Sequence, residues 1–166
     1  MTRVLVAYAT KMGGTAGIAQ EVAGELRSCG LIVDLRDVDD APAVEDYDAV
    51  VLGSAVYTGR WRRSAVALLR RLARNTDPPA VWLFHSGPTG PDARGRSLPP
   101  PRKVAELAAR LGADPPETFG GRIDSATATG FLARKMAQGD LAGDFRDFDR
   151  IRGWARTVAA SVTVAG

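Results

Sequence analysis

Short apolar runs and amphipathic stretches follow one another along the whole chain. The runs are typical of strands, which we expect at residues 3–9, 31–37, 47–55, 80–87 and 117–123. Between them, apolar residues recur every three or four positions, which predicts helices between Thr15 and Gly30 and at about 61–75, 102–111 and 147–162. Because helices separate successive strands, the pattern predicts an α/β fold with a parallel sheet covered on both faces.

The composition narrows this picture only slightly. The chain has 166 residues, 45% apolar and 25% charged, which fits one domain over residues 1–166. A net charge of +3 without long runs of like charge argues against nucleic acid as a partner. One cysteine excludes an internal disulfide and a multi-cysteine metal site, and no metal site is expected. No signal peptide or run of about 18 apolar residues is apparent, so we expect a cytoplasmic protein without an integral membrane segment.

The loop after the first strand has the composition of an anion site. In TKMGGT, residues 10–15, Gly13 and Gly14 leave backbone N–H groups free to surround an anion, and Thr10 and Thr15 add hydroxyl donors. The spacing matches neither the triphosphate loop nor the dinucleotide fingerprint, so a monophosphate is the expected ligand. The alternative is a glycine-rich turn in which Thr15 is the N-cap of the helix.

The loops after the third and fourth strands have compositions that suit a planar ring. Residues 53–63, GSAVYTGRWRR, place Tyr57 and Trp61 around Gly59, although Trp61 fits a core position equally well. Residues 85–95, HSGPTGPDARG, begin with His85, the only histidine in the chain. His85 is the candidate catalytic residue, by proton exchange with a cofactor, and a structural role is the alternative. The loop at residues 85–95, the third of the three, carries no aromatic residue, so one face of a bound ring would stay open to a substrate.

Together these loops resemble the flavodoxin family. The family's phosphate loop reads Thr/Ser-x-Thr-Gly-x-Thr, and residues 10–15 match every defined position except the middle threonine, which is Met12 here. The resemblance implies a flavodoxin-like, doubly wound, five-stranded parallel sheet in the order 2-1-3-4-5, and FMN as the cofactor. It implies that Thr10, Lys11, Met12, Gly13, Gly14 and Thr15 hold the phosphate. It also implies that the ring lies between Ser54, Ala55, Val56, Tyr57, Thr58 and Gly59 on one side and Ser86, Gly87, Pro88, Thr89 and Gly90 on the other.

Within that family, residues 47–73 look like the corresponding segment of the flavodoxin-type, menaquinone-dependent protoporphyrinogen dehydrogenases. Residues 124–146 occupy the place of an insertion in that subgroup, and 131–138 could form a short amphipathic helix there. The resemblance implies an FMN-dependent oxidoreductase that oxidises protoporphyrinogen IX or a similar planar substrate, with a quinone as acceptor. In this hypothesis Arg60, Arg62, Arg94 and Arg96 pair with the carboxylates of an acidic substrate.

Two alternatives remain open at this point. One is a flavodoxin-type electron carrier that docks on redox partners. The shuttles of the family are typically acidic on the flavin side, whereas arginines surround the predicted site here. The other is a flavodoxin-like domain with an altered cofactor such as a deazaflavin, or one that binds no cofactor and serves protein interactions.

Overall fold

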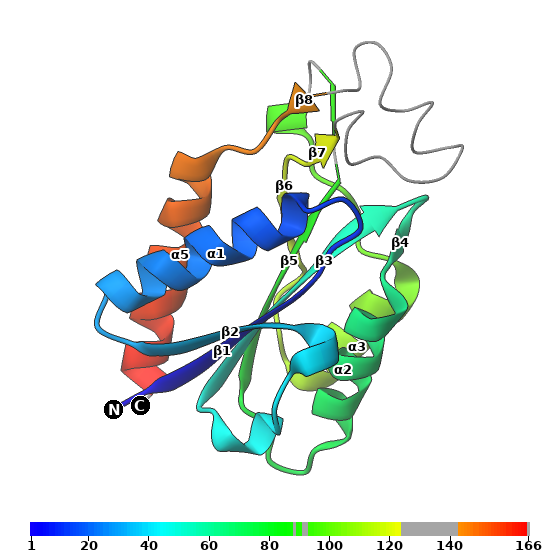
Figure 1. Cartoon of the computed structure of the whole chain (residues 1–166). Helices are drawn as coiled ribbons and strands as arrows, with labels where there is room; N and C mark the ends of the chain where they lie inside the picture. The colour runs from blue at the N-terminus through cyan, green and yellow to red at the C-terminus, as the bar shows by residue number, and fades with distance from the viewer. Residues whose placement is uncertain (88, 91–92, 124–142, 166) are drawn as a thin grey trace.

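The computed structural model describes residues 1–87, 89–90, 93–123 and 143–165, and a parallel β-sheet forms its centre (Figure 1). Within these residues, five parallel strands lie in the order β2 (Ile32–Asp37), β1 (Arg3–Ala9), β3 (Ala49–Tyr57), β5 (Ala80–Ser86) and β6 (Glu117–Phe119). Numbered among themselves along the chain, these strands have the order 2-1-3-4-5. The predicted doubly wound α/β fold is therefore confirmed.

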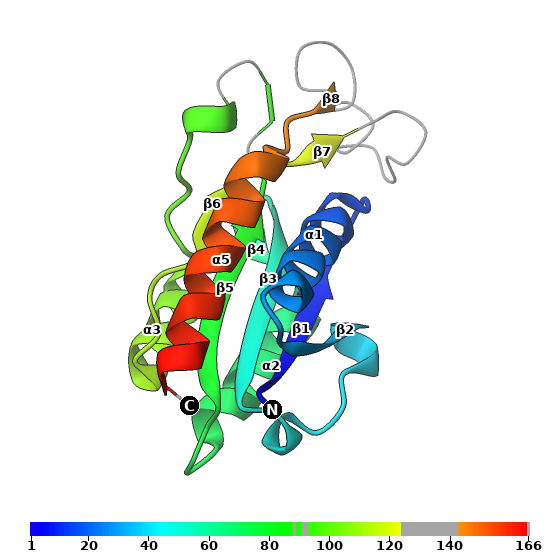
Figure 2. The same cartoon turned by 90° about the vertical axis from the view of Figure 1, so that its left-hand side faces the viewer.

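Helices cover both faces of this sheet (Figures 1 and 2). α1 (Gly14–Ser28) and α5 (Phe148–Ala165) lie on one face, and α2 (Arg63–Arg74) and α3 (Arg102–Leu111) lie on the other. Alternate residues of β1 point to opposite faces, so Val4 and Val6 pack in the first core and Leu5 and Ala7 in the second. Among the described helices, none is both long and apolar enough to cross a membrane.

The rest of the described secondary structure is short. Three 3-10 turns occur, η1 (Val38–Asp40), η2 (Val44–Asp46) and η3 (Ala93–Gly95). The strand β4 (Arg60–Trp61) pairs antiparallel with β3, and β7 (Arg122–Ile123) pairs antiparallel with β8 (Gly143–Asp144). Residues 124–142, including the expected short helix at 131–138, lie outside the described part of the chain.

The fifth strand differs from the prediction, because the run at 117–123 is divided in two. β6 stays in the main sheet, whereas β7 leaves it and pairs with β8. The division falls at Gly120, where a Cβ atom would lie only 2.0 Å from the carbonyl oxygen of Phe145. The adjacent Gly121 carbonyl accepts a hydrogen bond from the Phe145 N–H at 2.9 Å. Glycine at position 120 leaves room for the backbone at 145, which crosses where the chain leaves the sheet.

The start of the second helix also differs from the prediction. Trp61 was expected to begin a helix, but it belongs to β4, and α2 begins at Arg63. A tight turn at Thr58 and Gly59, with φ of 51° and 74°, folds the chain back so that Trp61 pairs with Val56. Positive φ at both central residues is typical of the turn type that favours a two-residue hairpin. Gly59 was the available signal, since glycine adopts positive φ readily, whereas the β-branched Thr58 is unusual in this conformation.

Candidate functional site

A pocket opens at the carboxyl edge of the sheet, where the three predicted loops meet. Its lining includes Thr10, Lys11, Met12, Gly14 and Thr15 after β1, Ala55, Val56 and Tyr57 at the end of β3, and Ser86, Gly87 and Thr89 after β5. Other predicted cofactor residues, Gly13, Ser54, Thr58, Gly59 and Gly90, belong to the same loops but are not part of the described lining. Pro88 lies outside the described residues. Three segments far apart in the sequence therefore form one pocket.

Sequence reasoning missed one wall of this pocket. Gly121 and Arg122 also line it, from the segment where the chain leaves the main sheet. The approach is close, because a Cβ atom on Gly14 would lie 3.2 Å from the backbone nitrogen of Arg122. The glycine pair at 120–121, inside a predicted strand, was the available signal, since glycine there often marks a close backbone approach.

The first loop directs the amino end of α1 toward the pocket. The N-cap of α1 is Gly13, with φ of 85°, and no side chain of the described residues caps it. The Gly13 N–H donates to Thr10 Oγ1 at 2.9 Å, which closes the loop. Thr15 lies in the first turn of the helix, so the alternative in which Thr15 is the N-cap is wrong. The amides of this turn and the positive end of the helix dipole favour an anion.

A pair of buried hydroxyl groups joins the first and third loops. Thr15 Oγ1 and Ser86 Oγ lie 2.8 Å apart, and the two residues are only 1% and 4% exposed. Two hydroxyl groups carry two hydrogens, and the bond between them uses one. Because both residues line the pocket, the second hydrogen can be donated to an acceptor inside it.

The first and second loops also make contact. The Lys11 Nζ atom lies 4.0 Å from the centroid of the Tyr57 ring, which is a cation–π distance. Both side chains line the pocket, so it combines an aromatic face with a positive charge.

His85 lies behind this wall, completely buried, and links the elements that carry the loops. Its Nδ1 accepts a hydrogen bond from Trp61 Nε1 at 3.0 Å. The Nε2 atom therefore carries the proton and donates to Thr118 Oγ1 at 2.9 Å, which also accepts from the Leu98 N–H at 3.1 Å. Burial lowers the pKa of His85 from 6.5 to about 4, so the ring is neutral at pH 7. His85 is not part of the described pocket lining.

Comparison with known proteins agrees with this geometry. A family model described as a flavodoxin domain matches residues 5–138. The chain belongs to the flavodoxin domain family. The match runs from β1 past β7 and includes all three pocket loops, so the family predicted from the loop motif is confirmed.

Individual relatives of this flavodoxin-domain chain are more distant. Protoporphyrinogen IX dehydrogenase [quinone] of Escherichia coli K12 is 27% identical over 96 residues. The match covers 55% of this chain and 53% of the relative, so the chain spans about half the length of the curated relatives it matches. Flavodoxin 2 of Bacillus cereus superposes with a TM-score of 0.61 at 17% identity, covering 96% of this chain and 99% of that one. The rubredoxin oxygen:oxidoreductase of Desulfovibrio gigas superposes with a TM-score of 0.66 at 16% identity, over 99% and 37% of the two chains. The structural likenesses show the fold.

A basic rim adjoins the pocket of this flavodoxin-domain protein. A second hollow, lined by Arg60, Arg62 and Arg63 among others, shares Tyr57 with the first. The three guanidinium groups form no ion pair with any residue that the structure describes. Arg96 is exposed, and the side chain of Arg94 lies outside the description. Arginines predicted to surround the site are thus present on the side of the β3–β4 hairpin.

Proposed function

We propose that this flavodoxin-domain protein binds FMN in the pocket at the carboxyl edge and acts as an oxidoreductase. The observation that carries the proposal is that the pocket joins a phosphate-type loop at the start of α1 with two loops suited to a planar ring. When bound, FMN would supply the hydride or electron transfer. The protein's own residues would bind it, orient it and control what reaches it.

The phosphate would lie at the loop of residues 10–15. This loop offers free amides of the first helical turn, and the spare hydroxyl hydrogen of the Thr15–Ser86 pair adds a donor. The Met12 side chain has no hydrogen-bond donor where the family has a threonine hydroxyl. The preceding residue, Lys11, supplies a positive charge. The donor set therefore fits a phosphate monoester.

The ring would lie against Tyr57, between the second and third loops. Ala55 and Gly87 have small side chains or none, which leaves space for a ring in this part of the pocket. Gly87 is closely surrounded, since a Cβ atom there would lie 3.2 Å from Val56 Cβ. Amides of Gly87, Thr89 and Gly90 would face the pyrimidine edge, where negative charge grows on reduction. We assign a positioning role to His85 in place of proton exchange, because both of its ring nitrogens hold other residues.

The substrate we propose is protoporphyrinogen IX or a similar planar, acidic molecule, with a quinone as acceptor. The E. coli relative has this activity by name, and the rim arginines, which form no ion pair with a described residue, could receive carboxylates. The basic rim also favours an enzyme over the acidic type of electron shuttle.

Two measurements on the purified protein test this proposal. The absorption spectrum after addition of FMN should show bound oxidised flavin, and a protein that leaves the FMN spectrum and fluorescence unchanged contradicts the cofactor. The FMN-loaded protein should then oxidise protoporphyrinogen with a quinone, in steady-state assays. Stable one-electron reduction without turnover of any porphyrinogen or quinone would instead indicate a carrier. Binding of a deazaflavin in preference to FMN would indicate an altered cofactor.

A further inference from the structure

A row of exposed arginines begins at the pocket rim and runs along α2. Between Asp48 and Asp77 the sequence contains six arginines and no acidic residue. Arg60 lies in the hairpin, and Arg63, Arg70 and Arg74 are exposed on α2. Spacings of 7 and 11 residues place these three on one face of the helix. A helix of this length spans about 18 Å, and α2 runs from β4 toward the opposite end of the sheet (Figure 1).

The start of α2 breaks the usual rule for helix charges. Its N-cap is Arg62, its first residue is Arg63, and its first turn contains no acidic residue. Cations at this end oppose the helix dipole and lower helix stability. No described side chain caps the end or pairs with the two guanidinium groups. Charges that cost stability and have no partner among the described residues are typical of a surface that binds something outside the protein.

The size of this surface decides which anion it suits. One carboxylate or phosphate would need two or three of the guanidinium groups at the rim, and would leave Arg70 and Arg74 unused. A row of positive charge about 18 Å long matches a macromolecular surface. Because the row begins beside Tyr57, which lines the proposed flavin pocket, whatever binds here approaches the flavin edge. That position suits a redox protein that takes electrons from the reduced cofactor as an alternative acceptor to the quinone.

We propose that Arg60, Arg63, Arg70 and Arg74 form a docking surface for an acidic redox protein. We call this set the α2 arginine row. Its docking role follows from charge and position, and only the redox nature of the partner rests on the proposed function. Long-range attraction between opposite charges would speed the encounter and orient the partner with its acidic face at the pocket.

The experiment uses an acidic plant-type ferredoxin as the probe, titrated calorimetrically into the full-length protein with FMN added. The test variant is Arg63→Glu/Arg70→Glu. The control is Arg36→Glu/Arg110→Glu, which changes two exposed arginines that are not members of the row, one on β2 and one on α3, and lowers the net charge equally. Glutamate at the first position of α2 favours the helix dipole, so misfolding is not the expected cause of lost binding. Circular dichroism checks that all three proteins are folded.

The wild-type protein should bind the ferredoxin saturably at low salt and more weakly as salt rises. The test variant should weaken binding on the order of tenfold or more, whereas the control should change it by about twofold or less. Absence of saturable binding at low salt, or equal losses in the two variants, overturns the docking surface. A short DNA duplex that binds more tightly than ferredoxin and depends on Arg63 and Arg70 overturns the assignment to a protein. FMN titration of the same samples is read separately, so failure of the cofactor proposal is distinguishable.

Discussion

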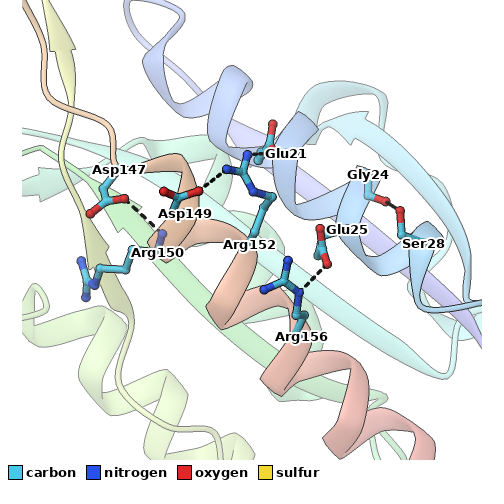
Figure 3. Close-up of polar contacts among 9 residues, drawn as sticks. All are labelled: Glu21, Gly24, Glu25, Ser28, Asp147, Asp149, Arg150, Arg152 and Arg156. Carbon is cyan, nitrogen blue, oxygen red and sulfur yellow. Dashed lines mark hydrogen bonds and ion pairs between the residues drawn. The ribbon is translucent and has the colours of Figure 1, made fainter.

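Two arginine-rich regions of this protein use their charges in different ways. On the α1–α5 face, Arg152 pairs with Glu21 at 2.6 Å and also with Asp149, and Arg156 pairs with Glu25 at 2.7 Å (Figure 3). The Arg152–Glu21 and Arg156–Glu25 pairs join α5 to α1, two elements at opposite ends of the chain, whereas the Arg152–Asp149 pair lies within α5. At the β4–α2 rim, Arg60, Arg62 and Arg63 have no ion pair with any described residue. The first set pairs within the fold, whereas the second forms no ion pair with a described residue and is available to a ligand or partner.

The comparison shows why composition says little about function here. Both regions raise the arginine content of the chain, and both contribute to its basic isoelectric point. The two regions differ in their nearby acidic residues. α1 supplies Glu21 and Glu25 to the α5 arginines, whereas the segment between Asp48 and Asp77 contains no acidic residue. The free charges lie where the pocket opens, which connects the local sequence to the proposed site.

The largest effect is expected beneath the pocket, where burial keeps His85 neutral. Its pKa is about 4 in the folded protein and near 6.5 in the unfolded chain. The unfolded state therefore binds more protons between these values, and stability is lost as pH falls from about 6.5 to 4. The loss should approach about 3 kcal/mol, measured by urea unfolding across this range.

His85 is the only histidine, so the control for this prediction is simple. A His85→Gln variant should lack the pH-dependent step, although it is less stable at neutral pH because Trp61 and Thr118 lose a partner. The same step in the variant would show that other groups, such as the carboxylates, cause it.

The next effect concerns the hydroxyl pair in the pocket. Thr15→Val keeps the shape of the side chain and removes the hydroxyl group of the first helical turn, so that Ser86 is the only donor left in the pair. FMN affinity should fall by about tenfold, which corresponds to roughly 1.5 kcal/mol, in a fluorescence-quenching titration. Thr157→Val makes the same chemical change on the exposed side of α5 and should leave the affinity unchanged. Equal affinities for all three proteins would remove Thr15 from the site.

The smallest effect tests the two arginine regions against each other. Arg152→Ala removes two ion pairs and should lower the melting temperature by roughly 1–3 °C, because partly exposed pairs contribute little each. Arg60→Ala removes no ion pair with a described residue and should leave the melting temperature unchanged. Differential scanning calorimetry at low and high salt measures both. A larger loss from Arg60→Ala would mean that the rim arginines are structural.

The fold could be predicted from sequence because its signals are periodic. Continuous apolar runs and four-residue repeats gave the five parallel strands and their helices at nearly the observed bounds. The first pocket loop was also recognisable, since Gly13 and Gly14 precede a helix directly after a buried strand. These features depend on neighbours in the sequence.

The parts that sequence did not reveal depend on contacts between distant segments. The glycine pair at 120–121 indicates a close backbone approach, but the local sequence does not indicate that the backbone at 145 makes it. Trp61 lies in β4 and not in the predicted helix, and its indole N–H donates a hydrogen bond to His85 on another strand. This bond and the hydrogen bond to Thr118 make His85 a buried link between Trp61 and Thr118. The position of His85 at the end of a strand did not indicate this role.

The central claim is that the loop at residues 10–15 holds the phosphate of FMN, and comparing FMN with riboflavin tests it most directly. The two ligands share the ring and differ only in the phosphate. If the amides of α1 and the Thr15–Ser86 pair bind phosphate, FMN should bind on the order of a hundredfold more tightly than riboflavin. Fluorescence titration of the purified protein measures both dissociation constants. Equal affinities for FMN and riboflavin would contradict the phosphate loop, and binding of neither would contradict the site.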